Sequence, residues 1–98
     1  MNKILVVDDE AGVCHSFKKI LGRHGYDVIS APDGQTAIEK TEHENPDLVI
    51  MDVSMPRMDG LEALKQLKAL HPGLLIIMMT AYSTSDKAIT SMKYGAYD

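Results

Sequence analysis

The chain has few of the features that mark secreted, membrane-bound or nucleic-acid-binding proteins. Its 98 residues include one cysteine, so no internal disulfide can form and a reducing cytoplasm is the simplest setting. The longest apolar run, LLIIMM, is too short to cross a membrane, and the N-terminal apolar run is too short for a signal peptide. The net charge of -4 disfavours a nucleic-acid-binding surface. We therefore expect one small cytoplasmic domain with no membrane or nucleic-acid contact of its own.

Short apolar runs alternate regularly with longer amphipathic segments. This order predicts right-handed strand–helix–strand units and therefore an α/β fold with a parallel sheet. There is no internal repeat, low-complexity tract or linker, so residues 1–98 are expected to form one domain. The expected strands are about Lys3–Asp8, Asp27–Ala31, Leu48–Asp52 and Leu75–Met79. The expected helices are about Val13–Arg23, a second between Asp33-Gly34 and Asn45-Pro46, Leu61–Leu70 and Ser85–Tyr94.

Helix faces and ends can also be predicted from side-chain types. Asp33 is a plausible N-cap for the second helix, because a carboxylate can accept hydrogen bonds from unpaired amides of the first turn. The buried face of the first helix is expected to carry Val13, Phe17, Ile20 and Leu21. Leu61, Leu64 and Leu67 are expected to do the same in the third helix, whereas Cys14 and the four histidines are assigned no special role.

Acidic residues close two of the expected strands. Asp8 and Asp9 end the run KILVVDD, and Asp52 ends LVIMD. Parallel strands bring their C-terminal ends to one edge of the sheet, where open α/β sheets bind ligands. Clustered carboxylates repel one another unless a cation lies between them, and an open site built from oxygen ligands suits Mg²⁺. The sequence therefore predicts an acidic, metal-binding pocket at this edge.

Several motifs at the ends of the expected strands point to one family. They are KILVVDDE at the start, DVSMPRMDG with Asp52, Pro56 and Gly60, MTAY with Thr80, and GAYD near the end. Over essentially all of its residues, the chain resembles the receiver domain of bacterial two-component response regulators. This resemblance implies a flavodoxin-like, doubly wound sheet with strand order 2-1-3-4.

The resemblance also implies a role for each site residue. Asp52 would be the phosphoacceptor, taking a phosphoryl group from a sensor histidine kinase. Asp9 and Asp52 would bind Mg²⁺ with the backbone carbonyl of Ser54, and Asp8 would lie in or just outside the set of ligands. Thr80 would be the switch hydroxyl that hydrogen-bonds the phosphoryl group and changes a protein-interaction surface. Such a domain is no enzyme beyond its own phosphorylation and dephosphorylation.

The strand–helix pattern stops soon after Gly95. The resemblance implies that the domain is incomplete at its C-terminus, lacking a fifth strand, with its phosphate-pairing lysine, and a last helix. We therefore expect Mg²⁺ binding but slow phosphorylation, and self-association through the exposed edge of the fourth strand. The effector domain is expected elsewhere in the native chain. Residues 82–98 have some similarity to regulators in which an ATPase and a DNA-binding domain follow the receiver, which would make the output transcription regulation.

Three other functions deserve comparison. A Mg²⁺-dependent hydrolase of the haloacid dehalogenase type would need a second acid two residues after its nucleophile, where this chain has Ser54. A nucleotide-binding module would need a glycine-rich turn after the first strand, where DDEAG offers only Gly12. A degenerate receiver that serves only for protein docking is disfavoured by the intact set of acidic residues, although truncation could produce the same outcome. A Mg²⁺ titration would distinguish it from a working receiver.

Overall fold

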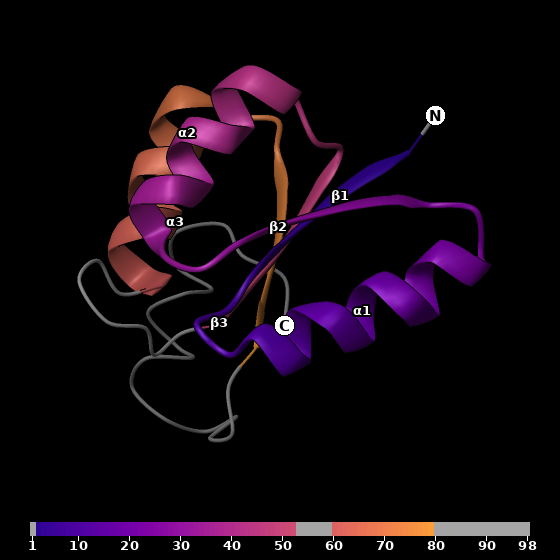
Figure 1. Ribbon diagram of the computed structural model, residues 1–98. Helices are drawn as coiled ribbons and strands as arrows, with labels where there is room; N and C mark the ends of the chain where they lie inside the picture. The colour runs from indigo at the N-terminus through magenta and orange to yellow at the C-terminus, as the bar shows by residue number, and fades with distance from the viewer. Residues whose placement is uncertain (1, 53–59, 80–98) are drawn as a thin grey trace.

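The computed structural model describes residues 2–52 and 60–79. Within them, strands and helices alternate along the chain (Figure 1). The strands are β1 (Lys3–Val7), β2 (Asp27–Ala31), β3 (Leu48–Asp52) and β4 (Leu75–Met79). The helices are α1 (Ala11–Arg23), α2 (Gly34–Glu44) and α3 (Gly60–Leu70). The helix expected over 85–94 lies outside the described residues.

The four strands form one parallel sheet in the order β2-β1-β3-β4. The register pairs Val7 with Ala31 on one side of β1 and with Met51 on the other. Because Asp8 follows Val7 and Asp52 follows Met51, this register brings the ends of β1 and β3 next to each other. The predicted fold class and strand order are confirmed.

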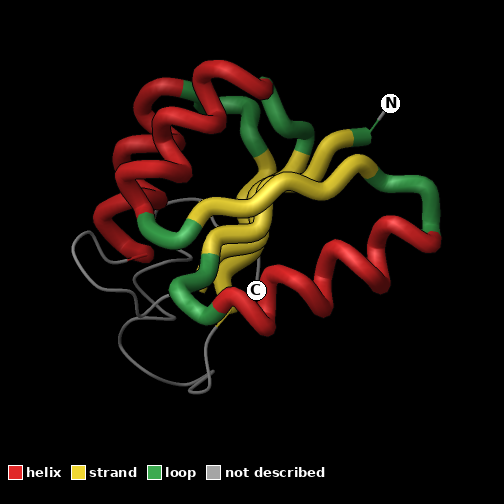
Figure 2. Tube along the Cα trace, in the orientation of Figure 1, coloured by secondary structure: helices red, strands yellow, loops and turns green. Residues whose placement is uncertain are grey.

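Helices cover both faces of the sheet. Figures 1 and 2 show α2 and α3 side by side on one face, with α1 on the other. The larger apolar core lies under α2 and α3 and includes the fully buried Leu5, Met51 and Leu64. A smaller cluster of Ile4, Val6, Cys14 and Ile50 lies on the side of α1. This second cluster holds the start of α1 against the end of β1, where the acidic residues lie.

The ends of α2 follow from its flanking residues. Asp33 accepts a hydrogen bond from the Thr36 amide at 2.8 Å, as expected of an N-cap. Asn45 ends the helix in the left-handed conformation, with φ at 48°, and its amide donates to the Thr41 carbonyl. Asparagine adopts this conformation more readily than most residues, and Pro46 cannot continue the helical hydrogen bonding. Both predicted limits of α2 are therefore confirmed.

The first helix differs from the prediction in two respects. It begins at Ala11, two residues before the expected start at Val13. Ile20 was predicted to face the core but is 54% exposed, and the side chain buried in its place is Cys14. The reason is that α1 packs against β1 and β2. The inward face of the helix is therefore centred on Cys14 and on Phe17 and Leu21, which pack against the smaller cluster.

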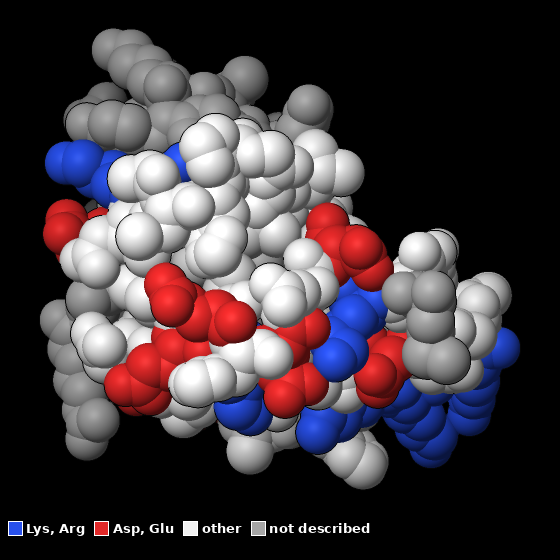
Figure 3. Space-filling model, turned by 90° about the horizontal axis from the view of Figure 1, so that it is seen from above, with Lys and Arg blue, Asp and Glu red and all other residues white. Residues whose placement is uncertain are grey.

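Opposite charges meet at the end of the sheet where the strands begin. Lys3 Nζ lies 2.9 Å from Glu44 Oε1, and the Lys3 amide donates to Asp47 Oδ2 at 2.8 Å. The Asp47 amide returns a bond to the Lys3 carbonyl, also at 2.8 Å. Figure 3, which views the molecule from above, shows acidic and basic side chains interspersed. Among the described residues, no helix is long and apolar enough to cross a membrane.

Candidate metal centre

Three carboxylates converge at the opposite end of the sheet. Asp8, Asp9 and Asp52 each offer an oxygen atom, and these oxygens all lie within 4.8 Å of one another. Asp8 is buried, Asp52 is half-buried and Asp9 is exposed. The predicted meeting of β1 and β3 at one acidic edge is thus confirmed, with an opening to solvent on the side of Asp9.

Backbone contacts fix the position of Asp8. Its amide donates to the Ala31 carbonyl at 3.1 Å, which extends the pairing of β1 with β2 by one residue. Its Oδ1 accepts a hydrogen bond from the Glu10 amide at 2.9 Å. That bond turns the chain sharply between the strand and α1. Asp9, in the middle of this turn, is left exposed next to the buried carboxylate.

The surroundings of Asp8 disfavour its charged form. Burial raises the pKa of its carboxyl group, while the hydrogen bond from the Glu10 amide opposes this shift. The negative charges of Asp52, Asp9 and Glu10 raise the pKa further. A cation bound among the three carboxylates would reverse this balance, because it would favour ionisation of all of them.

The set of donors fits a hard divalent cation. All three side chains offer carboxylate oxygens, the ligands that Mg²⁺ prefers, and the partial exposure leaves room for the water molecules that Mg²⁺ usually keeps. The spacing of the oxygens also allows one ion to contact more than one carboxylate. Of the predicted site residues, Asp8, Asp9 and Asp52 are therefore brought together. Ser54 and Thr80 lie outside the described residues.

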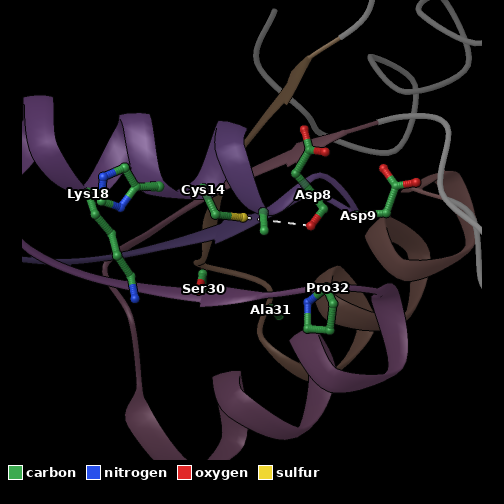
Figure 4. A pocket seen from close by; sticks show the side chains of 9 residues that line it. Asp8, Asp9, Cys14, Lys18, Ser30, Ala31 and Pro32 are labelled. Carbon is green, nitrogen blue, oxygen red and sulfur yellow. Dashed lines mark hydrogen bonds between the residues drawn. The ribbon is translucent and has the colours of Figure 1, made fainter.

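The prediction missed a buried thiol under the acidic edge. The Cys14 sulfur lies 3.6 Å from the Asp8 carbonyl oxygen and 4.0 Å from that of Val6. Burial raises the pKa of the Cys14 thiol, and the charge of Asp8 adds to the effect. A cavity of about 250 Å³ separates α1 from the end of β2 and is lined by Cys14, Lys18 and Pro32 among others (Figure 4). The available signal was the small side chain of Cys14, about one helical turn before Phe17, which packs against the smaller cluster.

Two other expectations can be compared with the structure. Gly12 lies inside α1 and not in a turn after β1, so the described residues contain no glycine-rich loop at this edge to hold a nucleotide phosphate. The group of candidate metal ligands found among the described residues consists of Asp8, Asp9 and Asp52. The histidines were expected to be solvated, but the Nε2 atom of His71 is buried and has no hydrogen-bond partner within the described part of the chain.

Comparisons with known proteins agree with this geometry. The chain is 43% identical over 96 residues to the alkaline phosphatase synthesis transcriptional regulatory protein PhoP of Bacillus subtilis, covering 98% of this chain and 40% of PhoP. It is 42% identical over 95 residues to the transcriptional regulatory protein ZraR of Escherichia coli, covering 97% of this chain and 22% of ZraR. The chain thus spans less than half the length of these relatives.

Solved structures show the same architecture. A response regulator receiver domain protein from Clostridium thermocellum superposes with a TM-score of 0.92 at 31% identity, covering 99% of this chain and 79% of that one. The chemotaxis protein CheY4 of Vibrio cholerae superposes with a TM-score of 0.91 at 32% identity, covering 98% and 82%. The family model described as the response regulator receiver domain matches residues 4–98. The chain therefore belongs to the receiver domain family of two-component response regulators, whose members accept phosphoryl groups in signalling.

Proposed function

We propose that Asp52 is the residue of this receiver that accepts the phosphoryl group, with Asp9 and Asp8 holding Mg²⁺ beside it. The observation that supports this most strongly is the convergence of the three carboxylates within 4.8 Å at the ends of two neighbouring strands. Asp52 occupies the end of β3, and its half-buried position keeps it accessible to a phosphoryl donor. Asp8 and Asp9 approach it from β1.

The proposed reaction is attack by a carboxylate oxygen of Asp52 on the phosphorus of a donor. A bond between that oxygen and phosphorus forms, and the bond from phosphorus to the leaving group breaks. With a sensor histidine kinase the leaving group is the imidazole of its phosphohistidine, and with acetyl phosphate it is acetate. A bound Mg²⁺ would neutralise charge on the phosphoryl oxygens. The domain would thus promote its own phosphorylation and later its own dephosphorylation, in which water cleaves the aspartyl phosphate, releases inorganic phosphate and restores the Asp52 carboxylate.

Two further roles are proposed from the resemblance of the sequence motifs to those of the family. Ser54 would provide a backbone carbonyl to the metal, and Thr80 would donate its hydroxyl hydrogen to a phosphoryl oxygen. A group that binds the phosphorylated state better than the free state shifts the balance between two conformations, which is the requirement for a switch.

Phosphorylation with acetyl phosphate tests the proposal. Intact-mass measurement of the chain should show addition of one phosphoryl group, and this should depend on Mg²⁺. Asp52→Asn should remove the added mass, because an amide is no nucleophile for this step. Asp47→Asn is the matched control, since Asp47 also lies next to β3 but at the opposite end of the sheet.

The outcomes separate the parts of the proposal. A phosphoryl group that persists in Asp52→Asn would show that another residue is the acceptor. Full modification after removal of Mg²⁺ by a chelator would show that the acidic cluster works without a metal. Tight binding of beryllofluoride to the wild type, and its loss in Asp52→Asn, would support the proposal by a second route.

The partners proposed for this domain are a sensor histidine kinase and an effector. PhoP and ZraR are both described as transcriptional regulatory proteins, and this chain matches only part of each. We therefore propose transcription regulation as the output, through an effector in the same native chain, without nucleic-acid contact by this segment. The buried free thiol of Cys14 fits the cytoplasm, where we place the protein.

We also propose self-association through β4. Among the described strands, β4 pairs only with β3, and Leu75 is 47% exposed. An apolar strand with an unpaired edge is prone to pair with another chain. Light scattering should show dimers or larger species, and Leu75→Lys should reduce them. A monomer at high concentration in the wild type would contradict this proposal.

A further inference from the structure

Cys14 lies directly beneath the acidic edge without taking part in it. Figure 4 shows its sulfur directed at the main chain of Asp8, while the carboxylates of Asp8 and Asp9 point away from it. The side chain is only 8% exposed and belongs to the smaller apolar cluster. As a neutral thiol it is a weak hydrogen-bond donor, and the Asp8 carbonyl oxygen, 3.6 Å away, accepts from it.

The main chain of Asp8 is thereby held from two sides. Its amide is bound by the Ala31 carbonyl of β2, and its carbonyl is contacted by the thiol from α1. Within residues 2–52 and 60–79, the carboxylate of Asp8 accepts one hydrogen bond, from the Glu10 amide to Oδ1. A shift of the Asp8 carbonyl would therefore move the carboxylate relative to Asp52, which comes from a different strand.

We propose that Cys14 is a positioning residue for the acidic site. Its thiol holds the Asp8 carbonyl, and so sets where the Asp8 carboxylate stands relative to Asp9 and Asp52. This inference rests on the proposed Mg²⁺ site for its consequence, but the contact itself is independent of any metal. Groups that orient a metal ligand affect affinity although they never touch the ion.

The neighbouring cavity makes the contact sensitive to the size of the side chain. The cavity of about 250 Å³ between α1 and the end of β2 lies next to Cys14, so a smaller residue leaves the Asp8 carbonyl room to move. A larger apolar residue would press against that carbonyl and offer it no donor. Serine keeps a donor at nearly the same place, alanine removes it, and valine replaces it by methyl groups.

Three substitutions and one control test the inference in the full chain. Cys14→Ser, Cys14→Ala and Cys14→Val are compared with Ile50→Val, which trims the same apolar cluster without touching Asp8. Two quantities are measured. One is the exchange rate of the Glu10 amide hydrogen without metal, and the other is the dissociation constant for Mg²⁺ from titration followed by NMR.

The inference predicts a defined pattern. Cys14→Ala and Cys14→Val should speed exchange of the Glu10 amide severalfold and weaken Mg²⁺ binding by up to about tenfold, the lower end of the range for groups that orient metal ligands. Cys14→Ser should stay within about twofold of the wild type in both, because it retains a donor. Ile50→Val should lower the free energy of unfolding and leave both quantities unchanged.

The opposite results would overturn it. If Cys14→Ala leaves the Glu10 amide as protected as in the wild type, or if Ile50→Val changes it equally, the thiol acts only as a core side chain. If the wild type binds no Mg²⁺ at all, the proposed function fails, and the exchange data still test the contact. If alanine and valine do not fold, Cys14→Ser losing protection of the Glu10 amide would be sufficient to reject a positioning role.

Discussion

The two ends of the sheet differ in how their charged side chains are arranged. Where the strands begin, Lys3 meets Glu44 and Asp47, so each charge has a partner of opposite sign or a backbone hydrogen bond. Where β1 and β3 end, Asp8, Asp9 and Asp52 bring three negative groups within 4.8 Å. The hydrogen bond between Lys3 and Glu44 raises the pKa of Lys3 and lowers that of Glu44. Both groups thus hold their charge more strongly than usual. At the acidic end, burial instead raises the pKa of Asp8.

This contrast distinguishes structural charge from functional charge. An exposed pair of opposite charges adds little to stability and does not need a bound ion to neutralise it. A cluster of like charges lowers the free energy of unfolding of the metal-free protein, because the charges repel one another. A bound cation would raise it again. A carboxyl group whose pKa is raised by burial and by like charges often marks a functional site, and Asp8 lies at the edge where parallel sheets bind ligands.

The largest loss of stability should come from a substitution in β1, which runs from one end of the sheet to the other. Leu5 lies in the middle of β1 and is fully buried in the larger core. Leu5→Ala should lower the free energy of unfolding by roughly 2–5 kcal/mol, because it removes buried methyl groups and leaves a cavity. Urea denaturation measures this value. A loss no larger than that of a surface substitution would show that the two ends do not depend on a common core.

Mg²⁺ should act on the acidic end alone. At a free concentration about 100 times the dissociation constant, the ion should raise the free energy of unfolding by about 2.7 kcal/mol. Asp9→Ala should abolish most of this gain, and Glu44→Gln at the other end should retain it. Thermal melts with Mg²⁺ and with a chelator measure the difference. An equal gain in both variants would place the ion elsewhere.

Asp8 should make the stability of the metal-free protein depend on pH. Its pKa is raised in the folded state, so the folded protein binds more protons than the unfolded chain in the acidic range. Stability should therefore fall as pH rises from the ordinary Asp range through the raised pKa of Asp8, and then level off. Asp8→Asn should remove this fall and be slightly more stable than the wild type at neutral pH without metal, because an amide carries no charge to be desolvated or repelled.

This pH effect has a clear control. With saturating Mg²⁺ the wild type should become more stable than Asp8→Asn at neutral pH, because the ion binds the charged carboxylate of Asp8 better than the neutral amide of the variant. Equal stability of wild type and Asp8→Asn at every pH, with and without Mg²⁺, would show that burial and the neighbouring charges do not raise the pKa of Asp8.

The smallest effect should come from the compensated end. Glu44→Gln breaks the ion pair with Lys3, whose partners are both on the surface. The change in melting temperature should be barely measurable and should vanish in high salt, because screening weakens exposed pairs. A large, salt-resistant loss would mean that this end is more than a surface contact, and the contrast between the ends would have to be abandoned.

Prediction from the sequence succeeded where the chain is punctuated strongly. The bounds of β2, β3 and β4 match the expected strands. Pro32 follows β2, Pro46-Asp47 precedes β3 and Pro72-Gly73 precedes β4, so turn-forming residues mark one end of each strand. The inward face of α1 was wrong at Ile20 because helical periodicity does not reveal which strands a helix crosses. Cys14 was overlooked for the same reason. The proposed role of Cys14 depends on its distance to the Asp8 carbonyl, and the order of residues along the chain does not reveal that distance.

The roles expected for Ser54 and Thr80 remain predictions from the sequence. The same holds for the helix over 85–94. All of them lie outside residues 2–52 and 60–79, which the structure describes.

By itself, the sequence determined that Asp8, Asp9 and Asp52 stand at strand ends and that those ends share one edge. Strand–helix alternation permits only right-handed crossovers in practice, and parallel strands must end on the same side. Only the tertiary structure decided that the carboxylate oxygens lie within 4.8 Å of one another and that Asp8 is the buried member of the three. It also decided that the Cys14 thiol contacts the Asp8 carbonyl. Distance and burial depend on neighbours from several elements at once, and these neighbours come together only when the chain has folded.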